Sequence, residues 1–285
     1  MFERISNSFA LARNSWEVLK QNKRLIVFPV ISGLACLVVL VSFAIPLVIL
    51  HNNGVFVDNN GNARTPIWAY PAAFAFYFCN YFIITFCNAA LVSCTLMYFN
   101  GEEPTVGDGF RAASARLPQI IAWSLVSATV GLLLRSIESA HEKVGAFIRS
   151  LLGSAWAIIT YFVVPVLVVE KVGPIDAIKR SVSLLKKSWG EALIGRIGIG
   201  FFMFLVTLPG VFLLVGGFLA VANGTTGLGL ALACLGLVYL LGASAVGSAL
   251  STIFLSATYQ YAAYETVPRG YDEEVIRGAF WSKKR

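Results

Sequence analysis

The sequence predicts an all-α fold, a polytopic membrane helix bundle with six transmembrane helices, and three observations lead to it. Apolar residues make up 57% of the 285 residues and charged residues only 13%, whereas soluble domains are about 45–50% apolar and about 25% charged. Six apolar runs are long enough for a helix to cross the roughly 30 Å of hydrocarbon in a bilayer. None of them alternates apolar and polar residues, as the strands of a membrane barrel do. We therefore expect a single integral membrane domain, 1–285.

The apolar runs fall at 25–50, 67–99, 118–135, 150–169, 192–222 and 228–264. The second and sixth runs exceed one bilayer thickness, so they should tilt or continue as helix beyond the membrane. The third run is short, and whether it fully crosses stays open. The first run is longer than the roughly 7–15 apolar residues of a signal peptide, so we expect it to be retained as a span.

The distribution of basic residues predicts the orientation of the chain. Of the 22 Lys and Arg residues, 18 lie in 1–24, in the second and fourth connections between runs, and in the C-terminal tail. The other four are Arg64, Arg135, Lys143 and Arg149. Because Lys and Arg accumulate on the cytoplasmic side of membrane proteins, we expect a protein of the cell (inner) membrane with both termini in the cytoplasm. The net charge of +7 is then mainly a topology signal.

Related phrases precede the first, third and fifth apolar runs, and a truncated copy follows the sixth. They are NSWEVLKQN (14–22), DGFRAASARL (108–117), SVSLLKKSW (181–189) and the shorter EVIRGAFW (274–281). Alignment places Ser15, Ala113, Ser181 and Ala279 at one marker position. Two runs follow each of the first three phrases. The sequence therefore predicts three repeats of an amphipathic helix plus a transmembrane hairpin, at about 1–100, 101–170 and 171–265, and a cytoplasmic tail at 266–285.

These phrases have the spacing of amphipathic helices, with apolar residues at steps of three and four and Arg, Lys and Ser opposite. Acid–base pairs at i, i+3 should stabilise the first turns, namely Asp108/Arg111, Asp176/Lys179 and Glu274/Arg277. Such helices could hold anionic lipid head groups, or could pack under the bundle with their cations serving only orientation. The head-group candidates are Lys179, Arg180, Lys186, Lys187, Arg13 and Lys20.

The phrase DAIKRSVSLLKKSW (176–189) follows a Pro-containing turn and leads into long apolar runs. In this it resembles uncharacterised bacterial multi-pass membrane proteins related to the membrane domain that precedes some glycerophosphodiesterases. The likeness covers the repeated phrases and the general layout, and it implies a membrane protein of unknown function. In that comparison the phosphodiesterase activity belongs to a separate soluble barrel, so the resemblance implies no catalytic residue here.

Two sets of polar residues lie inside the apolar runs. On a helix, Tyr77, Asn80, Tyr81 and Asn88 fall along one side, where they could bond neighbouring helices or line a polar cavity for a lipid head group or small solute. In the sixth run Ser244, Ser248, Thr252 and Ser256 recur at every fourth residue. This spacing predicts a helix-packing seam, with a cavity or a second subunit as the alternative.

The sequence shows no motif for catalysis or for a cofactor. The two histidines and five cysteines have no metal-ligand spacing, and no basic stretch is interleaved with aromatics for nucleic-acid binding. We expect no enzyme, no metal, no cofactor and no nucleic acid. The expected function is a non-enzymatic scaffold or accessory protein that contacts membrane lipids, a membrane protein partner or a second copy of itself. The alternative is a transporter or channel for a small or lipidic solute, with its path between the repeats.

Overall fold

The structure, a computed structural model, describes residues 13–56, 65–140 and 144–271, with side chains outside 137–147 and 188–197. Within these ranges the secondary structure is helical and contains no strand, which confirms the predicted all-α fold. Residues 13–21 are helical. The elements that follow are η1 (Lys23–Ile26), α2 (Val27–Asn52), α3 (Ala69–Phe99), α4 (Val106–Ser114), α5 (Leu117–Ala140), α6 (Val144–Ile159), α7 (Val163–Glu170), α8 (Pro174–Ala222) and α9 (Thr226–Tyr264).

Six spans in the described part of the chain have the length and apolar composition to cross a membrane, so the protein is a multi-pass membrane protein. They are Lys23–Asn52, Ala69–Phe99, Leu117–Ser136, Ile148–Glu170, Gly198–Ala222 and Thr226–Tyr264. Each overlaps one predicted run. The third span has 20 residues, which is enough to cross by length. Many apolar side chains of α2 are exposed, such as Leu34 at 59% and Val38 at 67%, as expected of a helix that faces lipid.

The chain divides into two compact units, which are described separately. The first comprises Met1–Val30, Cys94–Val106 and Lys186–Arg285, and the second comprises Ile31–Ser93 and Gly107–Leu185. The predicted division into three repeats stays a prediction. The basic phrase at 181–189 and the fifth span belong to one continuous helix, α8.

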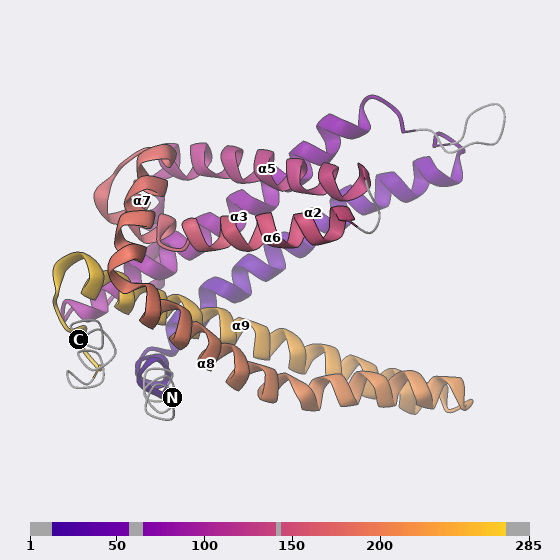
Figure 1. Cartoon of the computed structure of the whole chain (residues 1–285). Coiled ribbons are helices and arrows are strands. Elements are labelled where there is room, and N and C mark those ends of the chain that lie inside the picture. Colours follow the sequence, from indigo (N-terminus) through magenta and orange to yellow (C-terminus); the bar gives the residue numbers. More distant parts are fainter. Residues whose placement is uncertain (1–12, 57–64, 141–143, 272–285) are drawn as a thin grey trace. The chain divides into compact units, whose positions relative to one another are not determined.

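In the first unit, α8 and α9 run side by side (Figure 1) and touch at pairs of glycines. A Cβ atom at Gly217 would lie 2.8 Å from the carbonyl oxygen of Gly229. A Cβ at Gly236 would lie 3.0 Å from the carbonyl oxygen of Gly210. The two backbones therefore approach to a distance that no larger residue permits, the mode of close packing known from membrane helices.

The N-terminal helix of the first unit is held by the segment that follows α9. The Ser15 hydroxyl and the Tyr271 hydroxyl lie 2.7 Å apart in a buried hydrogen bond. Gly270, at φ +89°, lies against Val18, so that an added Cβ would be 3.0 Å from the valine side chain. Tyr271 also packs edge-on against Phe99 of α3, with ring centroids 5.9 Å apart. Residues 268–271 thus form part of the packed unit.

In the second unit, aromatic contacts join neighbouring helices. Helices α5 and α6 lie side by side (Figure 1), and Trp123 stacks on Trp156 with ring centroids 5.8 Å apart. A second set of stacked rings runs along α3 and reaches α4, where Phe110 stacks on Phe86 at 5.9 Å. These ring pairs add favourable energy beyond the area they bury.

The fourth span is broken between α6 and α7, at residues 160–162. Pro165 explains the break, because proline has no N–H and its ring clashes with the carbonyl four residues earlier. The break leaves the backbone N–H of Phe162 outside the helix pattern, and this N–H donates to the hydroxyl of Ser181 at 3.0 Å. Both residues are fully buried. The serine therefore satisfies a donor that has no access to water.

Candidate functional site

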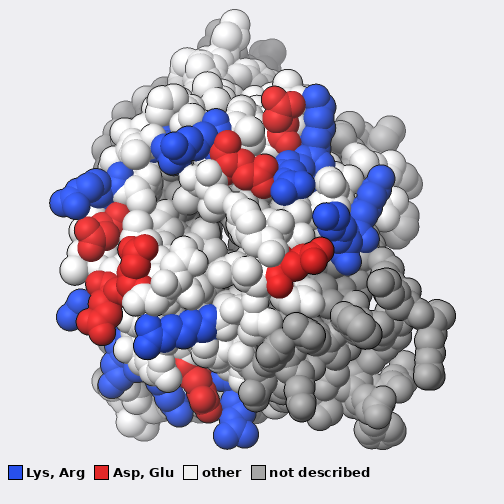
Figure 2. All heavy atoms as spheres, turned by 90° about the vertical axis from the view of Figure 1, so that its left-hand side faces the viewer, with Lys and Arg blue, Asp and Glu red and all other residues white. Residues whose placement is uncertain are grey.

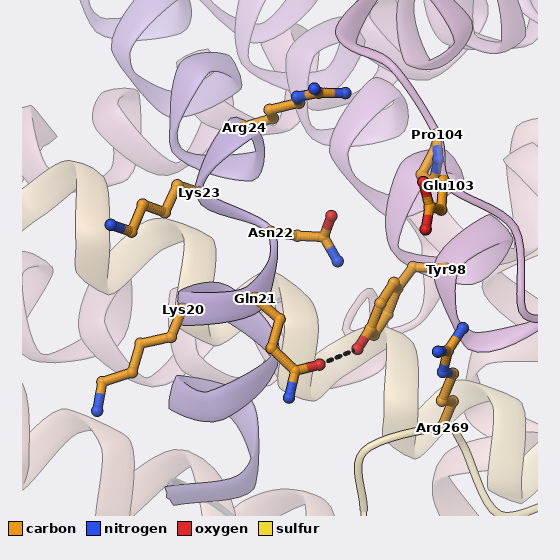
Figure 3. A pocket seen from close by; sticks show the side chains of 9 residues that line it. All are labelled: Lys20, Gln21, Asn22, Lys23, Arg24, Tyr98, Glu103, Pro104 and Arg269. Carbon is orange, nitrogen blue, oxygen red and sulfur yellow. Dashed lines mark hydrogen bonds between the residues drawn. The ribbon is translucent and has the colours of Figure 1, made fainter.

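A cation-lined pocket of about 550 Å³ lies within the first unit (Figure 3). Three stretches that are distant in the sequence line it. Residues 20–24 come from the end of the N-terminal helix and the start of η1, Tyr98, Glu103 and Pro104 come from the end of α3 and the segment after it, and Arg269 follows α9. We refer to it as the cation pocket.

The turn at Asn22 places Lys20, Lys23 and Arg24 at the pocket. Asn22 leaves the helical region with φ −123° and ψ 66°, so the helix 13–21 ends there and η1 begins at Lys23. The carbonyl of Asn22 accepts a hydrogen bond from the N–H of Leu25 at 3.0 Å. Leu25 is buried while Lys23 and Arg24 are exposed. Burial of the leucine therefore directs the two neighbouring cations outward.

Tyr98 forms the aromatic wall of the pocket. It is only 7% exposed, and its hydroxyl donates a hydrogen bond to the side-chain carbonyl oxygen of Gln21. The guanidinium of Arg269 lies over its ring, 5.4 Å from the centroid. A cation over an aromatic face is attracted by the ring quadrupole. Tyr98 thus contacts Gln21 near the start of the described chain and Arg269 near its end.

The charges around the pocket do not balance. Lys20, Lys23, Arg24 and Arg269 line the pocket together with a single carboxylate, Glu103. Lys20 lies over the ring of Trp16 at 5.5 Å. None of the four cations forms an ion pair with any residue that the structure describes. On the face of the molecule drawn in Figure 2, basic side chains are interspersed with acidic and uncharged ones. The pocket therefore offers positive charge to a ligand.

The other predicted head-group cations lie elsewhere, and acidic partners are described for Lys179, Arg180 and Arg13. Lys179 contacts Asp176 at 3.2 Å, as the i, i+3 spacing predicts. Arg180 contacts Glu170 at 2.8 Å, and Arg13 contacts Glu17 at 3.5 Å. Lys186 and Lys187 are exposed on α8. The predicted Asp108/Arg111 pair is also confirmed, at 3.4 Å, whereas Glu274/Arg277 lies outside the described residues. Of the six predicted cations, only Lys20 lines the pocket.

The predicted polar side of the second span has mixed surroundings. The amide of Asn80 donates to the carbonyl of Phe76 in its own helix at 2.8 Å. Asn88 is half-buried, and no hydrogen bond to its side chain is present among the described residues. Tyr77 stacks on Tyr81 at 6.4 Å and accepts a hydrogen bond from Arg135 at 3.3 Å. Whether the asparagines join helices or line a path stays a prediction.

The predicted seam of α9 is divided between exposed and buried positions. Ser244 and Ser248 are exposed, whereas Thr252 and Ser256 are buried. The hydroxyls of Ser244, Thr252 and Ser256 all donate to carbonyls of their own helix. The glycine pairs between α8 and α9 were not among the predicted packing positions. Their signal, glycines seven residues apart in both runs, is present in the sequence at 210, 217, 229 and 236.

The described residues contain no group of three or more His, Cys, Asp or Glu side chains that could hold a metal ion. The fold and the pocket define a multi-pass helical membrane protein with a cation-lined cavity. A family model described as a family of unknown function (DUF6159) matches residues 67–268, and the chain belongs to this family. No curated protein and no solved structure matches this chain significantly. The resemblance to the membrane domain that precedes some glycerophosphodiesterases stays a prediction.

Proposed function

We propose that the protein is a non-enzymatic membrane accessory protein that binds the phosphate-bearing head group of an anionic lipid in its cation pocket. One observation carries the proposal: four cations line a pocket of about 550 Å³ with only one carboxylate among its lining residues. Cations grouped without acidic partners repel one another, and a phosphate removes this cost. A lipid supplies the phosphate at the membrane surface, where the ends of the spans lie.

The side chains of the pocket suit a phosphate in particular. Arg24 and Arg269 each present a planar fork of N–H donors, which matches the oxygens of a phosphate in pairs. Lys20 and Lys23 add mobile point charges on flexible stems. The amide of Gln21 is fixed by Tyr98 and provides a neutral donor nearby. Together these groups can bind a phosphate by charge and a glycerol-type head group by hydrogen bonds.

The predicted orientation supports a site at the cytoplasmic surface. Residues 20–24 lie at the start of the first span, Tyr98 lies at the end of the second, and Arg269 follows the sixth. All three positions belong to the side on which 18 of the 22 basic residues lie. We infer that this side is cytoplasmic. Reporter fusions after Lys187 and after Thr225 test the orientation, because only the first should report from the cytoplasm.

The repeated phrases fit a common role in anchoring the interfacial helices. Their described marker residues Ser15, Ala113 and Ser181 are each 0% exposed. A small buried residue at the same place in each phrase supports the interpretation that one face of each amphipathic helix packs inward. In the N-terminal helix the basic face is then left for head groups, whereas Lys179 of α8 is paired with Asp176.

The alternative of a transporter or channel has one favourable observation, the break in the fourth span, because broken helices form binding sites in many transporters. However, the freed N–H of Phe162 already has an acceptor in Ser181. It is therefore not available to a solute. We consider lipid binding the better supported function.

Native mass spectrometry of the protein released from nanodiscs with equal phosphatidylglycerol and phosphatidylcholine tests the proposal. We expect the retained lipid to be enriched in phosphatidylglycerol. The variant Lys23→Gln/Arg24→Gln should reduce this enrichment by about fivefold per charge, since a basic residue near an anionic surface contributes roughly 1 kcal/mol. The matched control, Lys179→Gln/Lys187→Gln, removes two cations of α8 and should leave the enrichment nearly unchanged. Equal loss in both variants would show that general surface charge, not the pocket, selects the lipid.

A further inference from the structure

A second cavity of about 630 Å³ lies within the second unit, and it differs in chemistry from the cation pocket. Residues from the C-terminal part of α2, the start of α3 and the later turns of α5 line it. Its walls are almost entirely apolar, and Phe43 of α2 packs edge-on against Phe76 of α3 with ring centroids 5.5 Å apart. We refer to it as the apolar cavity.

Small residues of α3 create the space. Ala69, Ala72 and Ala73 line the cavity where larger residues of α2, such as Leu47, face it. Its volume lies in the range of about 300–1,000 Å³ that is typical of small-molecule sites. Because the walls belong to membrane spans, water has few polar partners in this space. An apolar chain is the occupant that such walls favour.

The apolar cavity has one charged group, Arg135 of α5. Its guanidinium donates to the hydroxyl of Tyr77 at 3.3 Å, and both residues line the cavity. Within the described residues Arg135 has no carboxylate partner. It lies near the end of the third span, where a basic side chain can reach the membrane interface. A cation next to an apolar space calls for a ligand with an apolar part and an anionic part.

We propose that the apolar cavity binds a phospholipid, with one acyl chain between α2 and α3 and the lipid phosphate on Arg135 and the Tyr77 hydroxyl. A phospholipid meets both features at once. A purely apolar molecule would leave the guanidinium without a counter-charge, and a free phosphate would leave the apolar walls uncovered. The site is independent of the proposed function, because it lies in the other unit and its lining residues are all different from those of the cation pocket.

Photo-crosslinking tests this site in the full-length protein reconstituted in bilayers. Two probes carry the same diazirine-bearing acyl chain, one in a phosphatidylcholine and the other in a diacylglycerol, which has no phosphate. Mapping of the adducts by peptide mass spectrometry compares the cavity segments 40–50 and 68–77 with the lipid-exposed segment 228–241 of α9 as an internal reference. We expect the phospholipid probe to label the cavity segments about three- to tenfold more than the diacylglycerol probe, relative to α9.

Two variants separate the head-group contact from the chain contact. Arg135→Gln should make the two probes label the cavity equally, whereas the control Arg149→Gln, an exposed arginine of α6 outside the cavity, should preserve the preference. Ala73→Leu should lower labelling by both probes, and Ala231→Leu on the exposed face of α9 should not. Equal labelling by the two probes in the wild-type protein, or adducts spread evenly over all spans, would overturn the proposal without any variant.

Discussion

The helix 13–21 and the first turns of α8 carry related basic phrases, yet they hold their cations differently. In α8, Lys179 and Arg180 contact Asp176 and Glu170, and the helix continues into the fifth span. The N-terminal helix instead ends at Asn22, and the cations around this end face a cavity without acidic partners. The two regions carry similar basic residues, but only the N-terminal helix ends next to a cavity. The end of the helix therefore distinguishes the candidate site from the basic surface of α8.

The marker serines of the two phrases differ as well. Ser181 accepts a hydrogen bond from a buried backbone N–H, whereas Ser15 bonds the hydroxyl of Tyr271. A backbone donor cannot turn away when its partner is removed, but a tyrosine hydroxyl belongs to a side chain that can adjust. Equivalent positions in the repeats should therefore tolerate mutation unequally.

The largest effect is expected for Ser181→Ala. This change leaves the buried N–H of Phe162 without its acceptor and should cost about 1–3 kcal/mol of unfolding free energy. Thermal unfolding in detergent should show a clearly lower Tm, and Ser181→Thr, which keeps the hydroxyl, should retain more of it. Ser183→Ala, an exposed serine of the same helix, is the control. If Ser181→Ala were as mild as this control, the hydrogen bond at the break would be unimportant.

A smaller effect is expected for Ser15→Ala and for Tyr271→Phe, about 0.5–1.5 kcal/mol each. The double variant should cost less than the sum of the two, because removal of both partners leaves neither unsatisfied. A double-mutant cycle from unfolding midpoints measures this coupling. Strictly additive losses would mean that the two hydroxyls do not stabilise each other.

The smallest effect is expected for Lys179→Gln. The ion pair with Asp176 is exposed and lies within one helix, so its loss should cost about 0.2–0.5 kcal/mol. Asp176→Asn should behave alike, and salt should reduce both effects. A loss above about 1 kcal/mol, outside the usual range for exposed pairs, would show that this phrase depends on its charges after all.

The sequence predicts the spans and the i, i+3 pairs well, because both are local properties. An apolar run is contiguous, and Asp108 and Arg111 share one helical turn whatever surrounds them. The break in the fourth span had a local signal too, Pro165, although the run was predicted as one uninterrupted span. That Ser181 accepts the hydrogen bond from this break could not be predicted, since its partner is a backbone N–H in a distant part of the sequence, between α6 and α7.

The cation pocket could not be predicted because its residues come from three distant stretches. Lys23 and Arg24 were recognised only as orientation signals, and Arg269 was assigned to a tail. Only the packing of residues 268–271 against the N-terminal helix brings them together. The close contact of α8 and α9 was missed for a similar reason. Small residues such as Ser244 and Ser248 indicate a seam on one helix, but which glycines meet depends on how two helices align.

The glycine pairs between α8 and α9 also have a consequence for biogenesis. Gly217 meets Gly229 next to the short connection 223–225, and Gly210 meets Gly236 farther along. Contacts between residues so near in the chain form early, with little loss of chain entropy. A shift of one residue would press a side chain such as that of Phe218 or Leu230 against the opposite backbone. We therefore expect α8 and α9 to pair with each other as soon as both are in the membrane. The glycines, which have no side chain, would then fix the register of this hairpin.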